Sequence, residues 1–322
     1  MTKEKTALLF VTGRGLGGDA VIAYNLIKLL TNNGIRCEIA LDESAPGLLF
    51  KKKGLDWHKV SIPQAGGHAA SKSAAAKAGV KTLKAVKRAK KLIQDLNVDL
   101  VLGVIGGGAV IGCMAAKRAK VPSVGVLSTP LDTKVCRKLT NNIIFPENPL
   151  FGEEELPDNL HKSFFPMDTK IMEGNKDNAL KLIKQHCDGL KKVDSSIIGF
   201  DENKKTILFS SGSTLFEKTA QAISEFSKYS EDYNLILIGS PLKDEFNKYI
   251  NQTKVINLGY IDWIADLYDL VDLAILTDDG IMLQEALICN IPIVILKRVK
   301  YGRYHNMATV FDGACLEADL DD

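Results

Sequence analysis

The stretch TALLFVTGRGLGGD, residues 6–19, decides the fold class of this chain. Residues 6–12 form a short apolar run typical of a buried parallel strand, and a glycine-rich segment follows at once. From residue 19 the apolar spacing becomes that of a helix, which we expect to end at residue 33, before Gly34. Strand, glycine turn and helix in this order begin a βαβ unit. The stretch therefore predicts an α/β protein with a parallel sheet.

The same alternation of strand and helix recurs along the chain in two blocks. The first block has predicted strands at residues 36–41, 57–60, 99–104, 123–127 and 142–145, and predicted helices at 74–96 and 109–119. The second block begins with a predicted helix at 176–192. Its predicted strands are 206–210, 235–239, 255–258, 273–277 and 291–296, and its other helices are 215–229, 243–251, 263–270 and 280–289. Prolines at 146, 149, 157 and 166 separate the two blocks.

Two blocks of this kind predict two domains. The chain has 322 residues, which is long enough for two domains of about 150 residues each. We expect an N-terminal Rossmann-like domain over 1–166 and a C-terminal Rossmann-like domain over 167–322, facing each other across a cleft. In such sheets the ligand binds at the carboxyl ends of the strands.

Composition and charge narrow the class of protein. The hydrophobic fraction of 46% and the charged fraction of 25% are typical of a folded, soluble protein. Residues 1–166 hold 24 Lys and Arg against 14 Asp and Glu, whereas residues 167–322 hold 17 against 25. A basic first half suggests an anionic partner, although unevenly solvated faces would give the same counts. The six scattered cysteines, without a CxxC pair, favour a reducing compartment over disulfides or a zinc site.

Residues 103–112 and 210–214 also place glycines directly after a predicted strand. Glycine lets backbone N–H groups approach a ligand closely, and a helix N-terminus favours negative charge. The opening stretch, residues 6–19, contains Gly13-x-Gly15-x-x-Gly18, which matches the dinucleotide-binding pattern, and Asp42 follows the second strand. An NAD-dependent dehydrogenase is therefore one interpretation. A dehydrogenase needs only one such turn. Three turns favour two domains that close over a nucleotide sugar and its acceptor.

The segment TDDGIMLQE, residues 277–285, indicates a nucleotide site in the second half. It follows a predicted strand and opens a helix, so a diphosphate can accept hydrogen bonds from the N–H groups of Gly280, Ile281 and Met282. The Glu285 carboxylate can then accept ribose hydroxyls. Alternatively, the two aspartates cap the helix and Glu285 is a solvated helix residue. Adjacent aspartate side chains diverge and no further oxygen ligands are evident, so we expect no metal.

Between Leu8 and about Cys315 the sequence resembles the MurG-like glycosyltransferases of family 28, which have the GT-B fold. The stretch Gly15-Leu16-Gly17-Gly18-Asp19 occupies the place of the family's first loop, GGTGGH. The other family motifs resemble, in order, residues 103–112, Ser210-Ser211-Gly212-Ser213-Thr214 for the GGSQG loop, Tyr260-Ile261-Asp262 for the uracil-contacting segment, and Glu285 for the ribose glutamate.

This resemblance implies an inverting transferase that moves N-acetylglucosamine from its UDP form to a lipid-linked cell-envelope precursor. It implies a UDP-sugar as co-substrate with no cofactor and no metal, and a cytoplasmic enzyme that is peripheral on the inner face of the membrane. Arg303 and Asn306 would lie near the donor sugar and phosphates, with Arg303 stabilising the leaving diphosphate. The implied substrate-binding residues are Gly15, Gly17, Gly18, Gly106, Gly107, Gly212, Ser213, Tyr260, Ile261, Gly280, Ile281, Met282, Glu285, Arg303 and Asn306.

Three departures from the family pattern affect the mechanism and the extent of the fold. Asp19 stands where the family has a histidine, and the third loop lacks two glycines. Asp19 would then be the catalytic base that takes the proton from the acceptor hydroxyl. Its alternative role is that of a helix N-cap. The sequence stops at Asp322, before the family's last helix, which crosses back to the first domain, so we expect either a truncated chain or a short branch of the family.

A basic segment, Lys72–Lys91, suggests a further partner. It carries Lys72, Lys77, Lys81, Lys84, Lys87, Arg88, Lys90 and Lys91, while Leu83, Val86, Ile93 and Leu96 are expected to face the core. These charges would hold the first domain against an anionic membrane, or they simply form a solvated helix face. The segment has no aromatic residue, which argues against binding to single-stranded nucleic acid.

Other functions remain open at this point. A UDP-sugar hydrolase or a non-hydrolysing epimerase would share the fold, and so would a non-catalytic subunit that binds a nucleotide sugar. The NAD-dependent dehydrogenase is the remaining alternative.

Overall fold

The computed structural model describes residues 4–12, 17–62, 72–191, 199–251, 253–300 and 302–320. The chain divides into two compact units: unit 1 is Met1–Pro166 with Tyr301–Asn306, and unit 2 is Met167–Lys300 with Met307–Asp322. The short segment Tyr301–Asn306 thus belongs to unit 1, although unit 2 precedes and follows it in the sequence. Among the described helices, none has the length and apolar character needed to cross a membrane.

Unit 1 is built on a seven-stranded parallel sheet in the order β3-β2-β1-β4-β5-β6-β7. The strands are β1 (Lys5–Val11), β2 (Ile35–Asp42), β3 (His58–Val60), β4 (Leu100–Val104), β5 (Ser123–Leu127), β6 (Asn141–Ile144) and β7 (Leu160–Lys162). The helices are α1 (Gly18–Asn32), α2 (Leu48–Lys52), α3 (Lys72–Asp95), α4 (Gly106–Ala119) and α5 (Pro130–Cys136). The strand order reverses between β1 and β4, which is where ligands bind in doubly wound sheets.

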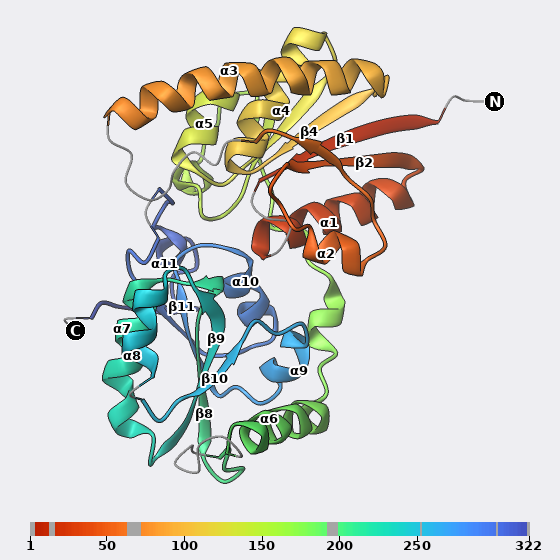
Figure 1. Cartoon of the computed structure of the whole chain (residues 1–322). Helices are drawn as coiled ribbons and strands as arrows, with labels where there is room; N and C mark the ends of the chain where they lie inside the picture. Colours follow the sequence, from red (N-terminus) through yellow and green to blue (C-terminus); the bar gives the residue numbers. More distant parts are fainter. Residues whose placement is uncertain are drawn as a thin grey trace. The chain divides into compact units, whose positions relative to one another are not determined.

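Helices cover both faces of this sheet. On one face, Leu8 and Phe10 of β1 pack against Val86 of α3 and Ile111 of α4 in one buried cluster. Figure 1 shows α1 on the opposite face from α3 and α4. Because both faces are covered, the strands read as almost continuous apolar runs, and this is why the sequence pattern located β1, β4 and β5 well.

Unit 2 contains a six-stranded parallel sheet in the order β10-β9-β8-β11-β12-β13. Its strands are β8 (Lys205–Leu215), β9 (Tyr233–Pro241), β10 (Ile256–Gly259), β11 (Leu273–Thr277), β12 (Ile293–Leu296) and β13 (Leu316–Ala318). Its helices are α6 (Lys176–Lys191), α7 (Glu217–Phe226), α8 (Asn247–Ile250), α9 (Ile264–Tyr268), α10 (Ile281–Ile288) and α11 (Met307–Val310). The two parallel sheets confirm the predicted α/β class with two Rossmann-like halves.

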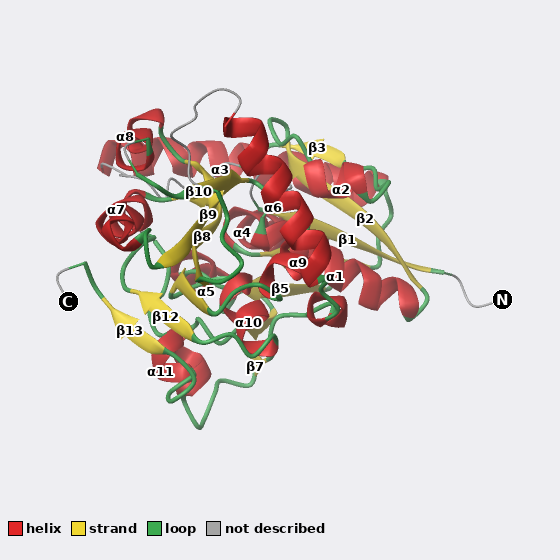
Figure 2. Cartoon of the chain, turned by 90° about the horizontal axis from the view of Figure 1, so that it is seen from below, coloured by secondary structure: helices red, strands yellow, loops and turns green. Residues whose placement is uncertain are grey.

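Alternate residues of the central strand β8 serve two separate cores. Ile207 and Phe209 pack with Ile223 of α7, whereas Leu208 packs with Ile183 of α6 and with residues of α9 and α10. Helices α7 and α8 lie side by side against the first of these two faces (Figure 2). This period of two is the expected signature of a strand buried on both sides.

Five short α-helices and strands of the described chain were not predicted. Two of them are α2, with five residues, and α11, with four. The strands β7 and β13 have three residues each, and α5 has seven. β7 lies in the proline-rich region that the sequence suggested was only a connection. A three-residue edge strand carries too few residues to show an alternating pattern, so its pairing with β6 is decided by the sheet and not by local sequence.

Candidate functional site

The loop after β11 forms a tight, glycine-dependent helix start in unit 2. Gly280 has φ 90° and ψ 175° and is the N-cap residue of α10, in a backbone region that is open mainly to glycine. The Thr277 hydroxyl donates a hydrogen bond of 2.8 Å to Asp279 Oδ1, which fixes the turn. The first N–H groups of a helix have no partner within the helix, and the N-cap residue Gly280 has no side chain that could cap α10. The loop therefore presents backbone donors at the carboxyl end of β11.

The predicted third glycine turn is a bulge within a strand, so that prediction was wrong in its local structure. β8 does not end at Ser210 but continues to Leu215, and its register with β9 shifts between Ser210 and Thr214. Gly212 has φ 94°, and its N–H donates to Ser210 Oγ at 3.0 Å. Side-chain hydroxyls thus replace the missing strand partners of the bulge. Ser213 lies in the same bulge and is partly exposed.

An unpredicted residue, Lys300, connects these two turns. A Cβ atom added to Gly212 would lie 4.0 Å from Lys300 Nζ, and one added to Gly280 would also lie 4.0 Å from it. Lys300 Nζ forms an ion pair with Asp279 Oδ1 at 3.0 Å. The sequence signal for Lys300 was its place in the loop after β12, the loop in which Arg303 and Asn306 were predicted to lie near the donor.

Glu285 is buried in α10 with 8% of its surface exposed, so the interpretation as a solvated helix residue was wrong. The Tyr268 hydroxyl donates a hydrogen bond of 3.1 Å to Glu285 Oε2. Burial raises the pKa of Glu285 from 4.5 to about 7, and the hydrogen bond from Tyr268 opposes this shift. Burial, together with the nearby Glu285 charge, also raises the pKa of Tyr268.

The predicted base-contacting pair lies at the edge of the same sheet. Tyr260 follows β10 directly and is 48% exposed. Ile261 is partly buried against the core that contains Leu267 and Leu283. An exposed aromatic ring next to a fixed aliphatic side chain is a suitable surface for stacking a planar base.

In unit 1, Asp19 lies inside the first turn of α1 and pairs with Arg303. Gly17 is the N-cap residue, with φ 82°, and α1 begins at Gly18, so the N-cap interpretation of Asp19 was wrong. Arg303 Nη2 lies 3.7 Å from Asp19 Oδ1, and both side chains are about one-quarter exposed. Both residues belong to unit 1. Gly15, also predicted in this loop, lies outside the described residues.

In the second glycine-rich segment, residues 103–112, a carboxylate of the same unit accepts a backbone N–H hydrogen bond. The N–H of Gly106, at the start of α4, donates to Asp132 Oδ2 at 2.6 Å, and the N–H of Gly108 donates to Thr12 Oγ1 at 2.6 Å. Asp132 is fully buried, and desolvation raises its pKa to about 6 despite hydrogen bonds from the N–H groups of Gly106, Thr129 and Ser128. The Gly106 N–H donor predicted to bind substrate is therefore occupied by Asp132, whereas the neighbouring Gly107 is partly exposed.

Gly108 serves packing between α4 and β1. A Cβ atom at this position would lie 2.6 Å from the Phe10 carbonyl oxygen and 2.7 Å from the Thr12 nitrogen. Both atoms are backbone and cannot move aside as a flexible side chain would. We expect Gly108→Ala to lower the free energy of unfolding of unit 1 by about 2 kcal/mol, measured by chemical denaturation. Gly152→Ala is the control, because no described atom lies within 4 Å of its added Cβ; equal effects of the two variants would refute the packing role.

Asn306 also contacts unit 1. Its Nδ2 donates to the Pro146 carbonyl oxygen at 3.2 Å. The structure thus places both Arg303 and Asn306 against residues of unit 1, whereas Gly212, Gly280 and Lys300 come together in unit 2.

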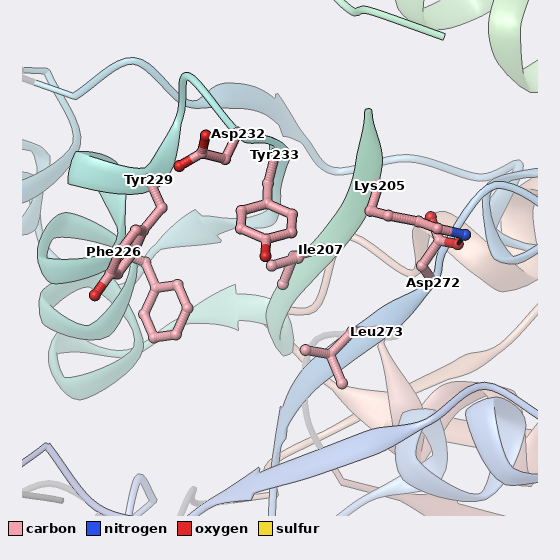
Figure 3. A pocket seen from close by; sticks show the side chains of 8 residues that line it. All are labelled: Lys205, Ile207, Phe226, Tyr229, Asp232, Tyr233, Asp272 and Leu273. Atoms are coloured by element: carbon pink, nitrogen blue, oxygen red, sulfur yellow. Dashed lines mark hydrogen bonds and ion pairs between the residues drawn. The ribbon is translucent and has the colours of Figure 1, made fainter. Parts of the chain in front are cut away.

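A hollow of unit 2 lies at the other end of its sheet, at the amino ends of the strands (Figure 3). It has a volume of about 630 Å³ and is lined by Lys205, Ile207, Phe226, Tyr229, Asp232, Tyr233, Asp272 and Leu273. Lys205 and Asp272 form an ion pair of 2.6 Å at its border. Lys205, Tyr233 and Leu273 are the first residues of β8, β9 and β11, and ligands of parallel sheets bind at the opposite, carboxyl ends. We therefore place the candidate site at the loops and not in this hollow.

The basic helix α3 exposes most of its described charges. Lys81, Lys84, Lys87, Arg88 and Lys91 are exposed, while the side chains of Lys72 and Lys77 lie outside the described residues. Val86 and Ile93 are buried as predicted, but Leu83 is 51% exposed, so the prediction that it faces the core was wrong. In the described part of the chain, no cluster of three or more His, Cys, Asp or Glu residues is arranged to bind a metal.

Comparison with known proteins finds a match to a glycosyltransferase family in the first part of the chain. Residues 9–124 match the Glycosyltransferase family 28 N-terminal domain. Over these residues the chain is similar to the glycosyltransferases of family 28. The match includes the end of β1, the first turn of α1 with Asp19, α3 and the Gly106 loop. It confirms the family resemblance and the glycosyltransferase class predicted from the sequence.

One relative and several solved structures are similar to this chain over most of its length. The chain is 26% identical over 311 residues to an Oenococcus oeni UDP-N-acetylglucosamine–N-acetylmuramyl-(pentapeptide) pyrophosphoryl-undecaprenol N-acetylglucosamine transferase, covering 89% of this chain and 76% of the relative. Acinetobacter baumannii MurG has a similar structure, with a TM-score of 0.59 and 15% identity, covering 98% of this chain and 86% of that one. The Neisseria meningitidis UDP-GlcNAc 2-epimerase bound to UDP-GlcNAc has a TM-score of 0.63 and 15% identity, covering 97% and 86%. These likenesses confirm the GT-B fold.

Proposed function

We propose that this chain is an inverting glycosyltransferase that transfers N-acetylglucosamine from its UDP form to a lipid-linked cell-envelope precursor. The observation that carries the proposal is the helix start at Gly280, which brings the first N–H groups of α10 to the carboxyl end of β11 inside a glycosyltransferase fold. The Oenococcus relative supports the choice of donor and acceptor. The 167–322 part of the chain would bind the donor, and the 1–166 part the acceptor.

On the donor side, each part of UDP has a candidate partner in unit 2. The uracil would stack beside Tyr260 and Ile261, the ribose hydroxyls would bind the Glu285 carboxylate, and the diphosphate would accept hydrogen bonds from the N–H groups of Ile281 and Met282. The helix macrodipole adds favourable potential at that end of α10. No metal is required in this arrangement, since backbone donors supply the charge stabilisation.

On the acceptor side, Asp19 would act as the general base. It would take the proton of the acceptor hydroxyl while that oxygen attacks the anomeric carbon and the bond to the UDP oxygen breaks. Arg303 is the positioning residue, because its guanidinium lies 3.7 Å from the Asp19 carboxylate and fixes the direction of the side chain. Gly17 and Gly18 add no side chains of their own at this helix start, which suits the approach of a bulky acceptor.

Thermal-shift measurements with UDP, UDP-N-acetylglucosamine and NAD test the donor assignment. We expect both uridine nucleotides to raise the melting temperature and NAD to leave it unchanged, since a ligand that binds only the folded state stabilises it. Stabilisation by NAD alone would exclude the proposal.

An epimerase or a hydrolase is the second candidate, because the N. meningitidis UDP-GlcNAc 2-epimerase shares the fold. Release of UDP distinguishes the possibilities. A transferase releases UDP only when an acceptor is present, a hydrolase releases it without one, and an epimerase converts the sugar nucleotide without a sugar acceptor. UDP release that is independent of acceptor would favour the hydrolase.

We further propose that α3 holds the enzyme at the inner face of an anionic membrane, where a lipid-linked acceptor resides. Replacing Lys81, Lys84 and Lys87 with glutamine should weaken binding to vesicles that contain anionic phospholipid by about tenfold or more, because each lysine near such a surface contributes about 1 kcal/mol. Sedimentation with the vesicles measures this, with Lys228, Lys243 and Lys248, exposed lysines of unit 2, as the matched control. Equal loss in both triple variants would contradict a specific role of α3.

A further inference from the structure

The Lys300 side chain is held in a fixed position beside the donor loops of unit 2. Its ammonium nitrogen lies 3.0 Å from Asp279 Oδ1, and only 16% of the Lys300 side chain and 2% of the Asp279 side chain are exposed. The same nitrogen lies 5.8 Å from the centroid of the Phe216 ring. A lysine normally places its charge in solvent, so a largely buried ammonium that is paired and packed in this way is built into the fold.

Two glycines leave open the space next to this ammonium. Gly212 and Gly280 both have positive φ, of 94° and 90°, and lie in loops that follow or interrupt the adjacent strands β8 and β11. Lys300 Nζ is the one described atom within 4.0 Å of an added Cβ at either position. At both turns, therefore, backbone atoms without a side chain face the space beside the Lys300 ammonium.

We propose that Lys300 binds the diphosphate of the nucleotide sugar and that Asp279 holds the ammonium in place. This inference rests on the proposed function, and it names the cation of the donor site. An ammonium has three N–H donors, and among the described residues Asp279 is its carboxylate partner, so donors remain for phosphate oxygens. The Asp279 charge alone would repel a diphosphate at the start of α10, and Lys300 neutralises it.

The assignment also changes the residue that stabilises the leaving group. As the bond between the anomeric carbon and the UDP oxygen breaks, its electron pair remains on the diphosphate, and the added negative charge is stabilised by the Lys300 ammonium and the N–H groups of α10. Arg303 had been expected in that role from the sequence. In the structure, Arg303 pairs with Asp19 within unit 1, whereas Lys300 borders the Gly280 turn within unit 2.

Calorimetric titration of the full chain with UDP and with uridine tests this proposal. We expect Lys300→Met to weaken UDP binding by about 10- to 100-fold, since a hydrogen bond to a charged group is lost, and to leave uridine binding unchanged because uridine has no phosphate. Lys297→Met is the matched control. The Lys297 ammonium pairs with Glu317 at 3.6 Å, and the Lys297 side chain is 36% exposed. Because Lys297 is not assigned to the diphosphate, UDP binding should stay at the wild-type level.

A double variant separates direct contact from simple neutralisation. If Lys300 only cancels the Asp279 charge, the combination of Lys300→Met with Asp279→Asn should restore UDP binding; if it touches the diphosphate, the double variant should stay weak. Restoration, or unchanged UDP affinity in Lys300→Met, would overturn the inference while the proposed function stands. A wild-type chain that does not bind UDP would overturn the proposed function, and this inference with it.

Discussion

Replacing Asp19 with asparagine is expected to lower the turnover number by about two to four orders of magnitude while donor binding is retained. The amide keeps the shape of the carboxylate but cannot take the proton of the acceptor hydroxyl. Donor binding should persist because Asp19 lies in unit 1, whereas Gly280 and Lys300 lie in unit 2. Initial rates at saturating UDP-sugar, together with UDP titration, measure the two effects separately.

Asp56→Asn is the control for this experiment, because Asp56 is an exposed aspartate of the same unit. It should leave the turnover number unchanged. Turnover of Asp19→Asn within a factor of about three of the wild type would assign the base to another residue. A fall of the same size in Arg303→Met as in Asp19→Asn would indicate that the ion pair as a whole, and not the carboxylate, is required.

The second large effect concerns stability and pH. Glu285→Gln is expected to raise the free energy of unfolding at pH 8 by about 3 kcal/mol relative to the wild type, and to change it little near pH 4.5. The pKa of Glu285 is raised in the folded state from 4.5 to about 7 by burial. Between these two values the folded protein holds a proton that the unfolded chain has released, so wild-type stability falls as pH rises. Above about pH 7 both states are ionised, and the loss is complete.

Glutamine has no proton to lose, and its amide oxygen can still accept the hydrogen bond from Tyr268. Chemical denaturation at several pH values between 4.5 and 8 measures the difference between the two proteins. The matched control is Glu217→Gln, because Glu217 accepts a hydrogen bond of 3.1 Å from Tyr249 at an exposed position of the same unit. Glu217→Gln should change the free energy of unfolding by no more than about 0.5 kcal/mol, as is usual for a surface substitution. An effect of Glu285→Gln that does not depend on pH would show that Glu285 is not desolvated in the folded protein.

The sequence was sufficient to predict the fold class and most element positions because these depend on local patterns. β5 and β11 have the predicted bounds, and α1 and α6 differ from prediction by one residue. Strands buried on both faces give apolar runs, and helices with one covered face give a period of 3.6 residues, so each can be recognised from its neighbours in sequence. The loops that join them were recognised for the same reason, because glycine after a strand marks a tight turn.

What each loop does was decided by tertiary contacts. The Gly106 N–H group meets Asp132, 26 residues further along the chain, and this pairing depends on the order of β4 and β5 in the sheet. The glycine pattern suggested a ligand-binding turn in each case. In the Gly106 loop, however, a buried carboxylate occupies the backbone donor, and the Gly212 segment is a strand bulge. The sequence marks where the backbone turns, but it does not show which distant side chain fills the turn.

The sequence by itself determined an α/β chain with two parallel-sheet halves and the family 28 glycosyltransferase class. Only the tertiary structure decided which charges lie at the candidate site: Arg303 beside Asp19 in unit 1, and Lys300 beside Asp279 in unit 2. Lys300 and Arg303 are only three positions apart in the sequence, but they belong to different units, and each pairs with an aspartate of its own unit. Local periodicity specifies secondary structure, whereas the position of a charge depends on long-range packing, which no local pattern records.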